Sequence, residues 1–352
     1  MKIKLLLLSL YSFFSFFQLV AQEGLPLYQD YLTSSWYLIH PSMAGAASAN
    51  QIRLTGRTQW LDVDDAPSLI TGSINGRVNK KIGLGLLVFS DTNGNFSENG
   101  VYGTFAYHLN LSARETELDQ LSFGISFGFL QNKLDETGFG ITAAQDQAVS
   151  GGVITDGYYN ADFGVSYLRQ DFYAHFSIKN ALPVNKDEFI LVDGTEPDNQ
   201  RKYIVTTGYT FNIGNPSAGL SFEPSLQYAT TPEISEQLID ANAKIYKQLV
   251  ENNTIWGGLA YRTVLEGTEF TLDNATVAEP TIQTQNYQTI SGFLGMDYKQ
   301  FVVAYTYTSQ LNDVKISDSG FHQITLGYNF GGESDARSGS KRWDCNCPAS
   351  NY

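Results

Sequence analysis

The stretch Gly320–Phe330, GFHQITLGYNF, decides the fold that we predict for this chain. From His322 onward its apolar side chains alternate with polar or small ones, and they are Ile324, Leu326, Tyr328 and Phe330. A period of two is typical of a β-strand with one apolar and one polar face. The preceding run, residues 300–309, alternates in the same way, so the pair predicts a hairpin. A soluble β-sandwich also contains such hairpins, and the rest of the chain has to separate the two folds.

The alternation recurs along the chain in about fourteen candidate strands, each near the ~9–11 residues that a tilted strand needs to cross a bilayer. We predict strands near residues 51–60, 66–78, 82–90, 100–111, 119–131, 159–168, 171–180, 201–212, 219–229, 240–249, 253–264, 286–298, 300–309 and 320–330. The weakest is 240–249, because Lys244 and Lys247 fall on opposite faces. The predicted fold is all-β: a single transmembrane antiparallel up-and-down β-barrel over residues 51–330, whose last strand pairs with its first.

The start of the chain predicts export from the cytoplasm. Residues 1–21 have a basic beginning, an apolar core and a small residue at Ala21, which is typical of a signal peptide cleaved near that position. A retained helical anchor is the alternative. We expect residues 22–50 to form a segment at the periplasmic mouth, partly inside the lumen, and residues 331–352 to form a polar periplasmic tail. A mean hydropathy of -0.19 excludes further membrane helices but not a barrel, whose strands average out by alternating.

The connections between the predicted strands differ in length. Tight turns follow the even-numbered strands, and longer polar segments such as 91–99, 132–158 and 265–285 follow most odd-numbered ones. Outer-membrane barrels have short periplasmic turns and long external loops. We therefore expect a barrel in outer-membrane lipid with both termini in the periplasm. The long segments also carry most of the acidic residues behind the formal net charge of -14, which excludes nucleic acid as a partner.

An outward apolar face assigns the other parity of each strand to the lumen. The charged residues predicted to face the lumen are Arg53, Arg57, Arg77, Glu223, Arg262 and Asp297. Because buried charges are costly unless paired, we expect Arg–carboxylate pairs across the lumen. Such pairs either only fill and rigidify the barrel or line a ligand channel. Glycines predicted on the same face either let another segment approach the wall or allow curvature, and they are Gly83, Gly85, Gly124 and Gly128.

No motif in the sequence predicts catalysis, a cofactor or a metal site. The four histidines lack ligand spacing, and the DTNGN run at Asp91–Asn95 lacks the distal Glu of a calcium loop, so we expect a turn there. Cys345 and Cys347 stand one residue apart, which is poor geometry for a mutual disulfide. We predict a protein that is not an enzyme, and an embedded Ser/His lipid-modifying hydrolase is the alternative.

Several short motifs resemble those of the PorP/SprF family, outer-membrane proteins of type IX secretion and gliding motility in Bacteroidota. The aromatic lead YQDY, Tyr28–Tyr31, precedes HPSMAG at His40–Gly45, which is similar to the family box Asn-Pro-Ala-Tyr-Ala-Gly. RTQW at Arg57–Trp60 is similar to the family motif Arg-x-Gln-Trp, and Pro67 opens a strand where the family has a proline at a similar place. The terminal Tyr328–Phe330 fits as well. The chain departs from the family pattern at His40 and Met43 of the box, at Asp64-Asp65, and in its extension beyond Phe330.

The resemblance implies a non-enzymatic partner of the secretion machinery without a cofactor. Such proteins help to export or anchor cargo, often adhesins with a C-terminal sorting domain, and contact periplasmic or lipoprotein components. The motif residues that it marks are His40, Pro41, Gly45, Arg57, Gln59, Trp60 and Pro67. We expect Pro41 and Gly45 to fix the turn, Arg57 to hold it by charge-assisted hydrogen bonds, and Trp60 to lie near an interface. The charged lumen favours a second function, a channel or transporter for a small or amphipathic solute.

Overall fold

The computed structural model describes residues 35–63, 65–113, 117–138, 151–182, 200–214, 219–249, 253–265, 268–272, 281–311 and 318–331. The predicted signal peptide, the aromatic lead Tyr28–Tyr31 and the tail with Cys345 and Cys347 lie outside these residues. No helix among the described residues is long and apolar enough to cross a membrane.

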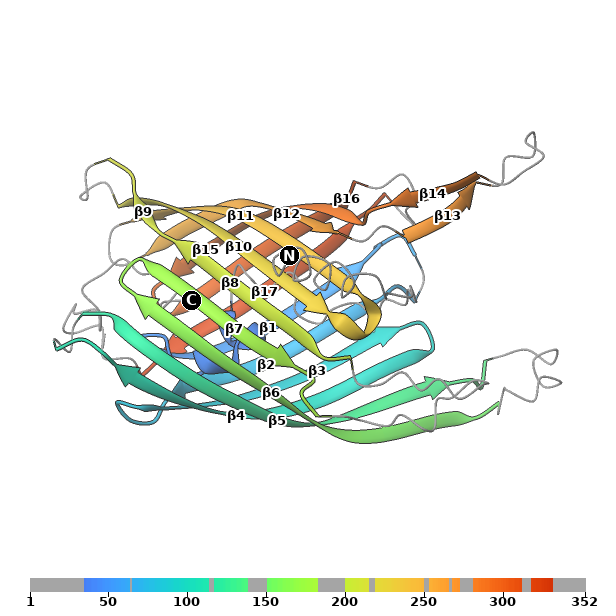
Figure 1. Cartoon of the computed structure of the whole chain (residues 1–352), viewed down its shortest axis with the longest axis horizontal. Helices are drawn as coiled ribbons and strands as arrows, with labels where there is room; N and C mark the ends of the chain where they lie inside the picture. The colour runs from blue at the N-terminus through green and yellow to red at the C-terminus, as the bar shows by residue number, and fades with distance from the viewer. Residues whose placement is uncertain are drawn as a thin grey trace, which may run out of the picture.

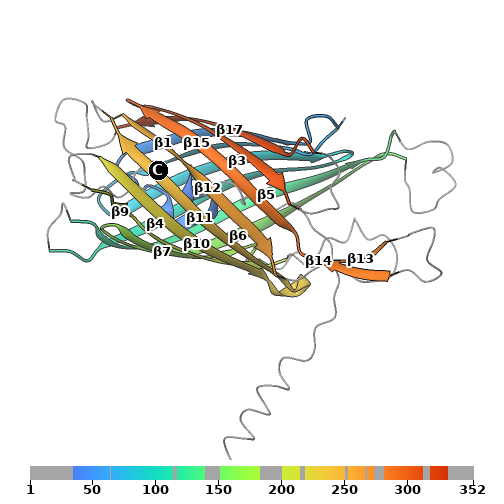
Figure 2. The ribbon, with the colours of Figure 1, turned by 90° about the horizontal axis from the view of Figure 1, so that it is seen from above.

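Fourteen antiparallel strands form one closed barrel (Figures 1 and 2). In chain order they are β1 (Asn50–Gln59), β2 (Ser68–Arg77), β3 (Ile82–Asn93), β4 (Phe96–Asn110), β5 (Asp119–Asp135), β6 (Val153–Arg169), β7 (Phe172–Lys179), β8 (Lys202–Tyr209) with its continuation β9 (Phe211–Asn212), β10 (Leu220–Thr231), β11 (Glu236–Gln248), β12 (Thr254–Val264), β15 (Gln288–Tyr298), β16 (Phe301–Gln310) and β17 (Phe321–Phe330). Each strand pairs with its neighbours along the chain, and β17 pairs with β1. The predicted barrel and its strand number are confirmed.

The β1–β17 seam pairs both strands over their full length, from Asn50↔Phe330 to Gln59↔Phe321. Its side chains follow the parity read from the sequence. Ile324 is 55% exposed on the outer face, whereas Thr325 is 1% exposed and its hydroxyl lies 2.9 Å from that of Thr55 inside the barrel. Apolar side chains outside and hydrogen-bonded polar ones inside are the arrangement that lipid around a barrel requires.

The long-loop end of the barrel differs from the prediction. The expected loop 91–99 is mostly strand, because β3 and β4 continue to a two-residue turn at Gly94–Asn95, where Gly94 has φ +56°. The predicted loop 132–158 is also shortened, since β5 and β6 each run for 17 residues. Alternation continues in these extensions with polar outward side chains, which hid them from a reading based on apolar faces. Two further strands, β13 (Thr268–Leu272) and β14 (Thr281–Gln285), pair within the predicted loop 265–285.

Before β1 the chain forms two short helical elements, α2 (Trp36–Ile39) and the 3-10 turn η2 (Pro41–Met43). His40 between them is extended, with φ -115° and ψ 104°, as expected of a residue before proline. Pro41 then begins η2, where its missing N–H leaves no intrahelical bond unmade. Gly45 follows with φ +68° and turns the chain toward β1.

Candidate functional site

Residues Ser35–Ala47, which we call the plug segment, lie inside the barrel (Figures 1 and 2). Every residue of the plug segment is buried, and η2 packs against β4, β5 and β6. Trp36 and Met43 join an apolar cluster with Leu118, Leu168 and Tyr173 of the wall. Since burying a large apolar side chain contributes about 1.5–3 kcal/mol, these contacts hold the plug segment firmly in place.

Glycines of the wall allow the box His40–Gly45 to approach closely. A Cβ on Gly124 of β5 would collide with the backbone of Pro41 and Ser42, and one on Gly83 of β3 would collide with the carbonyl of Ala44. Gly85 similarly makes room for the Tyr37 ring. Of the two roles left open for these glycines, the close approach of another segment is the one that the structure shows at these three positions.

The polar atoms of the box are bonded to the inner wall. His40 Nδ1 lies 2.6 Å from Ser177 Oγ on β7, and His40 Nε2 lies 3.1 Å from Thr206 Oγ1 on β8. The hydroxyls of Ser42 and Ser166 are 2.5 Å apart. Buried polar groups are stable only when they are hydrogen-bonded, so these partners specify one position for the box within the barrel.

The end of the box is held at the short-turn mouth. The carbonyl of Ala44 lies 3.0 Å from His108 Nε2, and the amide of Gly45 donates to Asn75 Oδ1 across 3.1 Å. Arg77 Nε donates to the Gly45 carbonyl across 2.8 Å. The role expected of Arg57, holding the box turn, therefore belongs to Arg77.

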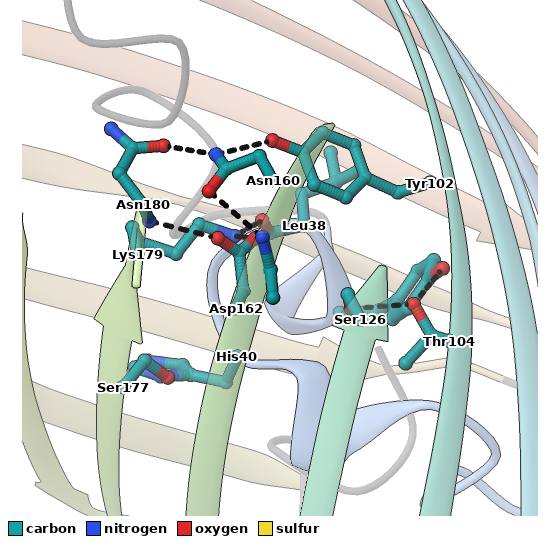
Figure 3. A network of polar contacts seen from close by, with 12 residues as sticks. Leu38, His40, Tyr102, Thr104, Ser126, Asn160, Asp162, Ser177, Lys179 and Asn180 are labelled. Atoms are coloured by element: carbon teal, nitrogen blue, oxygen red, sulfur yellow. Dashed lines mark hydrogen bonds and ion pairs between the residues drawn. The ribbon is translucent and has the colours of Figure 1, made fainter. Parts of the chain in front are cut away.

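A buried ion pair lies beside His40 (Figure 3). Lys179 Nζ is 2.6 Å from Asp162 Oδ2 and donates to the carbonyl of Leu38 across 3.4 Å. Burial, with His175 and Lys179 nearby, holds the pKa of His40 well below 6.5, so its ring is neutral. A neutral imidazole accepts at one nitrogen and donates at the other, which matches its two hydroxyl partners.

Hydrogen bonds continue from His40 along the inner wall, through the neighbouring strands β8, β10, β11 and β12. Thr206 donates to Gln227, and Gln227 donates to Asp240 across 3.2 Å. Asp240 accepts two bonds from Arg262, from Nε at 2.5 Å and from Nη2 at 2.9 Å. The plug segment and a buried ion pair on β11 and β12 thus belong to one polar network.

The charges predicted for the lumen are distributed differently from our expectation. Arg262 is buried but pairs with Asp240 directly beside it on the next strand, not across the lumen. Glu223 accepts from the hydroxyls of Tyr173 and Tyr246, each at 2.7 Å. Asp297 on β15 is also buried. The pairing is local because opposite residues of neighbouring strands lie closer than residues across a filled lumen.

The remaining arginines of the prediction lie at different heights. Arg53 is 1% exposed, packs against Gly327 and donates from Nη1 to the carbonyl of Ile52 across 2.9 Å. Arg57 is buried near the long-loop end with its guanidinium 5.2 Å from the centre of the Phe321 ring. Arg77 is half-buried at the short-turn mouth, where Nη2 also donates to Gln120.

The run Arg57–Trp60 lies at the far end of β1 from the box. The backbone N–H of Gln59 donates to the carbonyl of Pro67 across 3.0 Å, and Gln59 is the cross-strand partner of Phe321 on β17. Trp60 has φ +47°, donates its amide to the Gly320 carbonyl across 2.8 Å, and packs edge-on to the Phe321 ring. These residues shape the first connection at the long-loop mouth and do not touch the box.

Sequence reasoning missed Asp162, Lys179, Asp240 and Lys244, all of which are buried on the inner face. Parity could have found Lys179, because it falls on the same face of β7 as Tyr173 and His175. Lys244, taken as a defect of its strand, lies 4.0 Å from the centre of the Trp256 ring and 4.6 Å from that of Tyr246. A cation over aromatic faces explains how a lysine is accommodated inside the barrel.

Comparison with known families gives a match that covers most of the chain. The family described as "Type IX secretion system membrane protein PorP/SprF" matches residues 20–328. No curated protein matches the chain.

Solved barrels are similar only in outline. CdiB from Acinetobacter baumannii is 10% identical with a TM-score of 0.42 over 80% of this chain, which spans 60% of the CdiB structure. The CymD monoaromatic hydrocarbon channel is 9% identical with a TM-score of 0.45, over 80% of this chain and 88% of that one. Omp33 of Acinetobacter baumannii is 7% identical with a TM-score of 0.41, over 81% of this chain and 100% of that one.

Proposed function

The chain belongs to the PorP/SprF family of type IX secretion system membrane proteins, and from this premise we propose that it helps to export or anchor secreted cargo at the cell surface. The cargo class that we propose is adhesin-like proteins with C-terminal sorting domains. The outer-membrane barrel supplies the anchor in lipid, and periplasmic or lipoprotein components of the secretion and gliding machinery supply the contacts below it.

The docked plug segment is the observation that supports this role best. A diffusion channel needs a continuous water-filled lumen, whereas here the box His40–Gly45 is bonded to β7, β8 and β2 inside the barrel. Lys179 pairs with Asp162, and Arg262 pairs with Asp240, so these charges are engaged in ion pairs within the wall. A filled barrel suits a protein that acts through its two rims, where secretion components and cargo can bind.

We propose that the short-turn rim faces the periplasm and the long-loop rim faces outward. Asn50 and Phe330 are cross-strand partners, so the chain enters and leaves the barrel at the same rim. That rim also carries the tight connections, such as residues 170–171 between β6 and β7 and residues 299–300 between β15 and β16. Outer-membrane barrels place such turns in the periplasm, and the acidic loops would then face the medium.

Deletion of the gene tests the proposed role. We expect one or a few sorting-domain adhesins to disappear from the cell surface while the remaining secreted proteins are exported normally. Complementation with the intact gene should restore them. Unchanged surface display of every sorting-domain protein would refute the proposal.

A channel for a small or amphipathic solute is the second candidate, and the charged inner wall is the observation that favours it. Planar-bilayer recording of the purified barrel separates the two functions. Stable single-channel steps from the wild-type protein would favour the channel, whereas a silent barrel would favour the secretion role.

A further inference from the structure

Strand β6 extends past its neighbour β7 at the long-loop end of the barrel (Figure 1). It pairs with β5 over its whole length, from Val153 to Arg169, but with β7 only from Phe163 onward. Within the part of the chain that the structure describes, residues 153–160 of β6 therefore have a neighbouring strand on one side only. We call residues 153–160 the open edge.

The ladder between β6 and β7 ends because the chain turns away after β7. Asn180, the residue that follows β7, has φ +56°, a left-handed conformation in which a strand does not continue. Its side-chain oxygen accepts a hydrogen bond from Asn160 across 2.6 Å (Figure 3). One further backbone bond, from the N–H of Ala181 to the carbonyl of Ala161 across 2.8 Å, completes the ladder. The open edge lies directly beyond this point.

The last backbone bond also identifies the groups that face the open edge. In an antiparallel strand the N–H and C=O of one residue point to the same side, and this side alternates from residue to residue. Since the carbonyl of Ala161 points toward β7, the other odd-numbered residues point the same way, and they are Val153, Thr155, Gly157 and Tyr159. The open edge thus presents the row of donors and acceptors to which another strand can add.

The open edge lies beyond the lipid-facing band of the barrel. On the outer face Tyr159 packs against Phe127 and Phe129 of β5, with ring centroids 5.7 and 5.4 Å apart. Aromatic girdles of this kind mark the interface between membrane and water. Further along the strands the outward side chains of Gln131 and Thr155 are polar. Because backbone groups in lipid must all be paired, a strand edge can stay open only outside the lipid, as here.

The sequence of the open edge permits strand addition. Exposed edges are commonly blunted by lysine, proline or a bulge. The open edge reads VITDGYYN, which contains neither lysine nor proline, and its register with β5 is continuous. Valine, isoleucine, threonine and tyrosine all favour extended backbone. The edge is therefore already in the conformation that a partner strand requires.

Side chains of the open edge define the kind of strand that fits it. On the inner face Asp156 is half-buried and forms no ion pair among the described residues. On the outer face a Cβ at Gly157 would lie 2.8 Å from the Phe129 ring, so this ring covers the glycine. Residues directly opposite each other on paired strands interact. A basic residue is favoured opposite Asp156, and an aromatic or large apolar residue is favoured opposite Gly157, where it meets the Phe129 ring.

We propose that the open edge binds an extended segment of another polypeptide, which adds to β6 as an antiparallel strand in continuation of β7. Such a segment carries basic residues on one face and aromatic or apolar residues on the other. A second copy of this chain fits less well, because its long segments carry the same excess of acidic residues. The chain's own residues 183–199 contain five acidic residues and one lysine, so they fit less well for the same reason. That the segment belongs to exported cargo rests on the proposed function, whereas strand addition does not.

Fluorescence anisotropy of labelled synthetic peptides with the purified full-length protein in detergent tests the proposal. The matching peptide is Thr-Thr-Tyr-Lys-Thr-Val-Thr, which in antiparallel register places its tyrosine opposite Gly157 and its lysine opposite Asp156. We expect saturable binding of this peptide. A second peptide with glutamate in place of the lysine should bind about fivefold more weakly or worse, since opposite charges across strands are stabilising and like charges are destabilising.

Variants of the open edge separate recognition of the backbone from recognition of side chains. Thr155→Pro removes an N–H that faces the edge and none that bonds β5, so it should weaken binding about tenfold or more. Thr155→Ala keeps this N–H and should bind like the wild type. Asp156→Lys should reverse the preference between the two peptides. Glu233→Lys, the same change at an exposed site between β10 and β11, should leave the preference as it is.

Heat-modifiable migration on gels verifies that each variant is folded, and if Thr155→Pro does not fold, Asp156→Lys decides. The proposal is overturned if the matching peptide shows no saturable binding up to ~1 mM, a dissociation constant at which association is only marginal. Binding by folded Thr155→Pro equal to that of the wild type would also overturn it. Binding that appears only after residues 183–199 are replaced by a glycine–serine linker would mean that the chain covers its own edge, and would overturn it too.

Surface display in cells separates this inference from the proposed function. We expect the Thr155→Pro strain to lose the same adhesins as the gene deletion. If the deletion removes adhesins and Thr155→Pro does not, cargo does not dock at the open edge, and the proposed function stands. If the deletion itself has no effect, the proposed function fails, and the peptide assay alone decides strand addition.

Discussion

Arg77 and Gly45 are joined by a 2.8 Å hydrogen bond from the guanidinium Nε to the carbonyl, and this bond ties the plug segment to the first hairpin of the barrel. The same guanidinium donates from Nη2 to Gln120 on β5. One side chain thus links the box to two strands at the mouth where the chain enters. A charge-assisted bond of this kind contributes about 1.5–3 kcal/mol.

Arg77→Met should loosen the plug segment without unfolding the barrel, because methionine keeps an apolar stem and removes the donors. We expect a cysteine placed at Ala47 to react with a maleimide about tenfold faster or more in this variant, as the loss of the bond implies. Cys345 and Cys347 are replaced by serine in both backgrounds. Lys81→Met, an exposed change on the same rim, should leave the labelling rate unchanged. Equal rates in Arg77→Met and wild type would show that the bond does not hold the plug.

Gly124→Val should displace the box, because its side chain would occupy the space of the Pro41 and Ser42 backbone. Overpacking of this kind costs about 1–3 kcal/mol. We expect bilayer recordings to show transient openings that the wild type lacks. Gly103→Val is the control, since a Cβ at Gly103 on the outer face of β4 meets nothing within 4 Å. A silent Gly124→Val barrel that remains folded would mean that the plug segment is not what closes the lumen.

Removing one partner of the buried Arg262–Asp240 pair should lower the free energy of unfolding strongly, whereas replacing both partners with apolar residues should lower it little. Asp240→Leu leaves an uncompensated guanidinium inside the barrel, which costs about 3–5 kcal/mol. The double variant Asp240→Leu/Arg262→Met removes both charges and should recover most of that loss. Urea unfolding in detergent, followed by tyrosine and tryptophan fluorescence, measures the free energy of unfolding of the single and the double variant. If the double variant is no more stable than the single one, the polar network reaching Gln227 matters more than the pair itself.

Sequence alone predicts the barrel because every strand repeats one simple rule. Ile324 and Thr325 differ in exposure as their parity requires, and the β1–β17 seam follows from an even number of strands. The extensions of β5 and β6 escape that rule, since their outward side chains meet water instead of lipid. Strand existence is therefore predictable where lipid selects the outer face, and less so beyond it.

The interior is harder to predict, because it depends on cross-strand register and on the path of the plug segment. Arg57 is near the box in sequence but lies at the opposite end of β1, whereas Arg77 returns to the box through the β1–β2 hairpin, where Arg77 N bonds Asn50 Oδ1. Register also brings Asp162 and Lys179 together from different strands. Pairing the first two predicted strands as a hairpin would have placed Arg77 near the box, but no pattern in the sequence indicates the Asp162–Lys179 ion pair.

His40 should make the stability of the barrel depend on pH below neutrality. Its pKa in the folded protein is held well below 6.5 by burial, with His175 and Lys179 adding to the effect, so between these two pKa values the unfolded chain binds a proton that the folded protein does not. The stabilisation is therefore fully present above pH 6.5 and is lost as pH falls below it, by about 1.4 kcal/mol per pH unit. His40→Asn should remove this component, because asparagine does not titrate. Urea unfolding midpoints of both proteins between pH 7.5 and the acid limit of the detergent test the difference. If the urea unfolding midpoints of wild type and His40→Asn change with pH in the same way, His40 is not the cause of the pH dependence of stability.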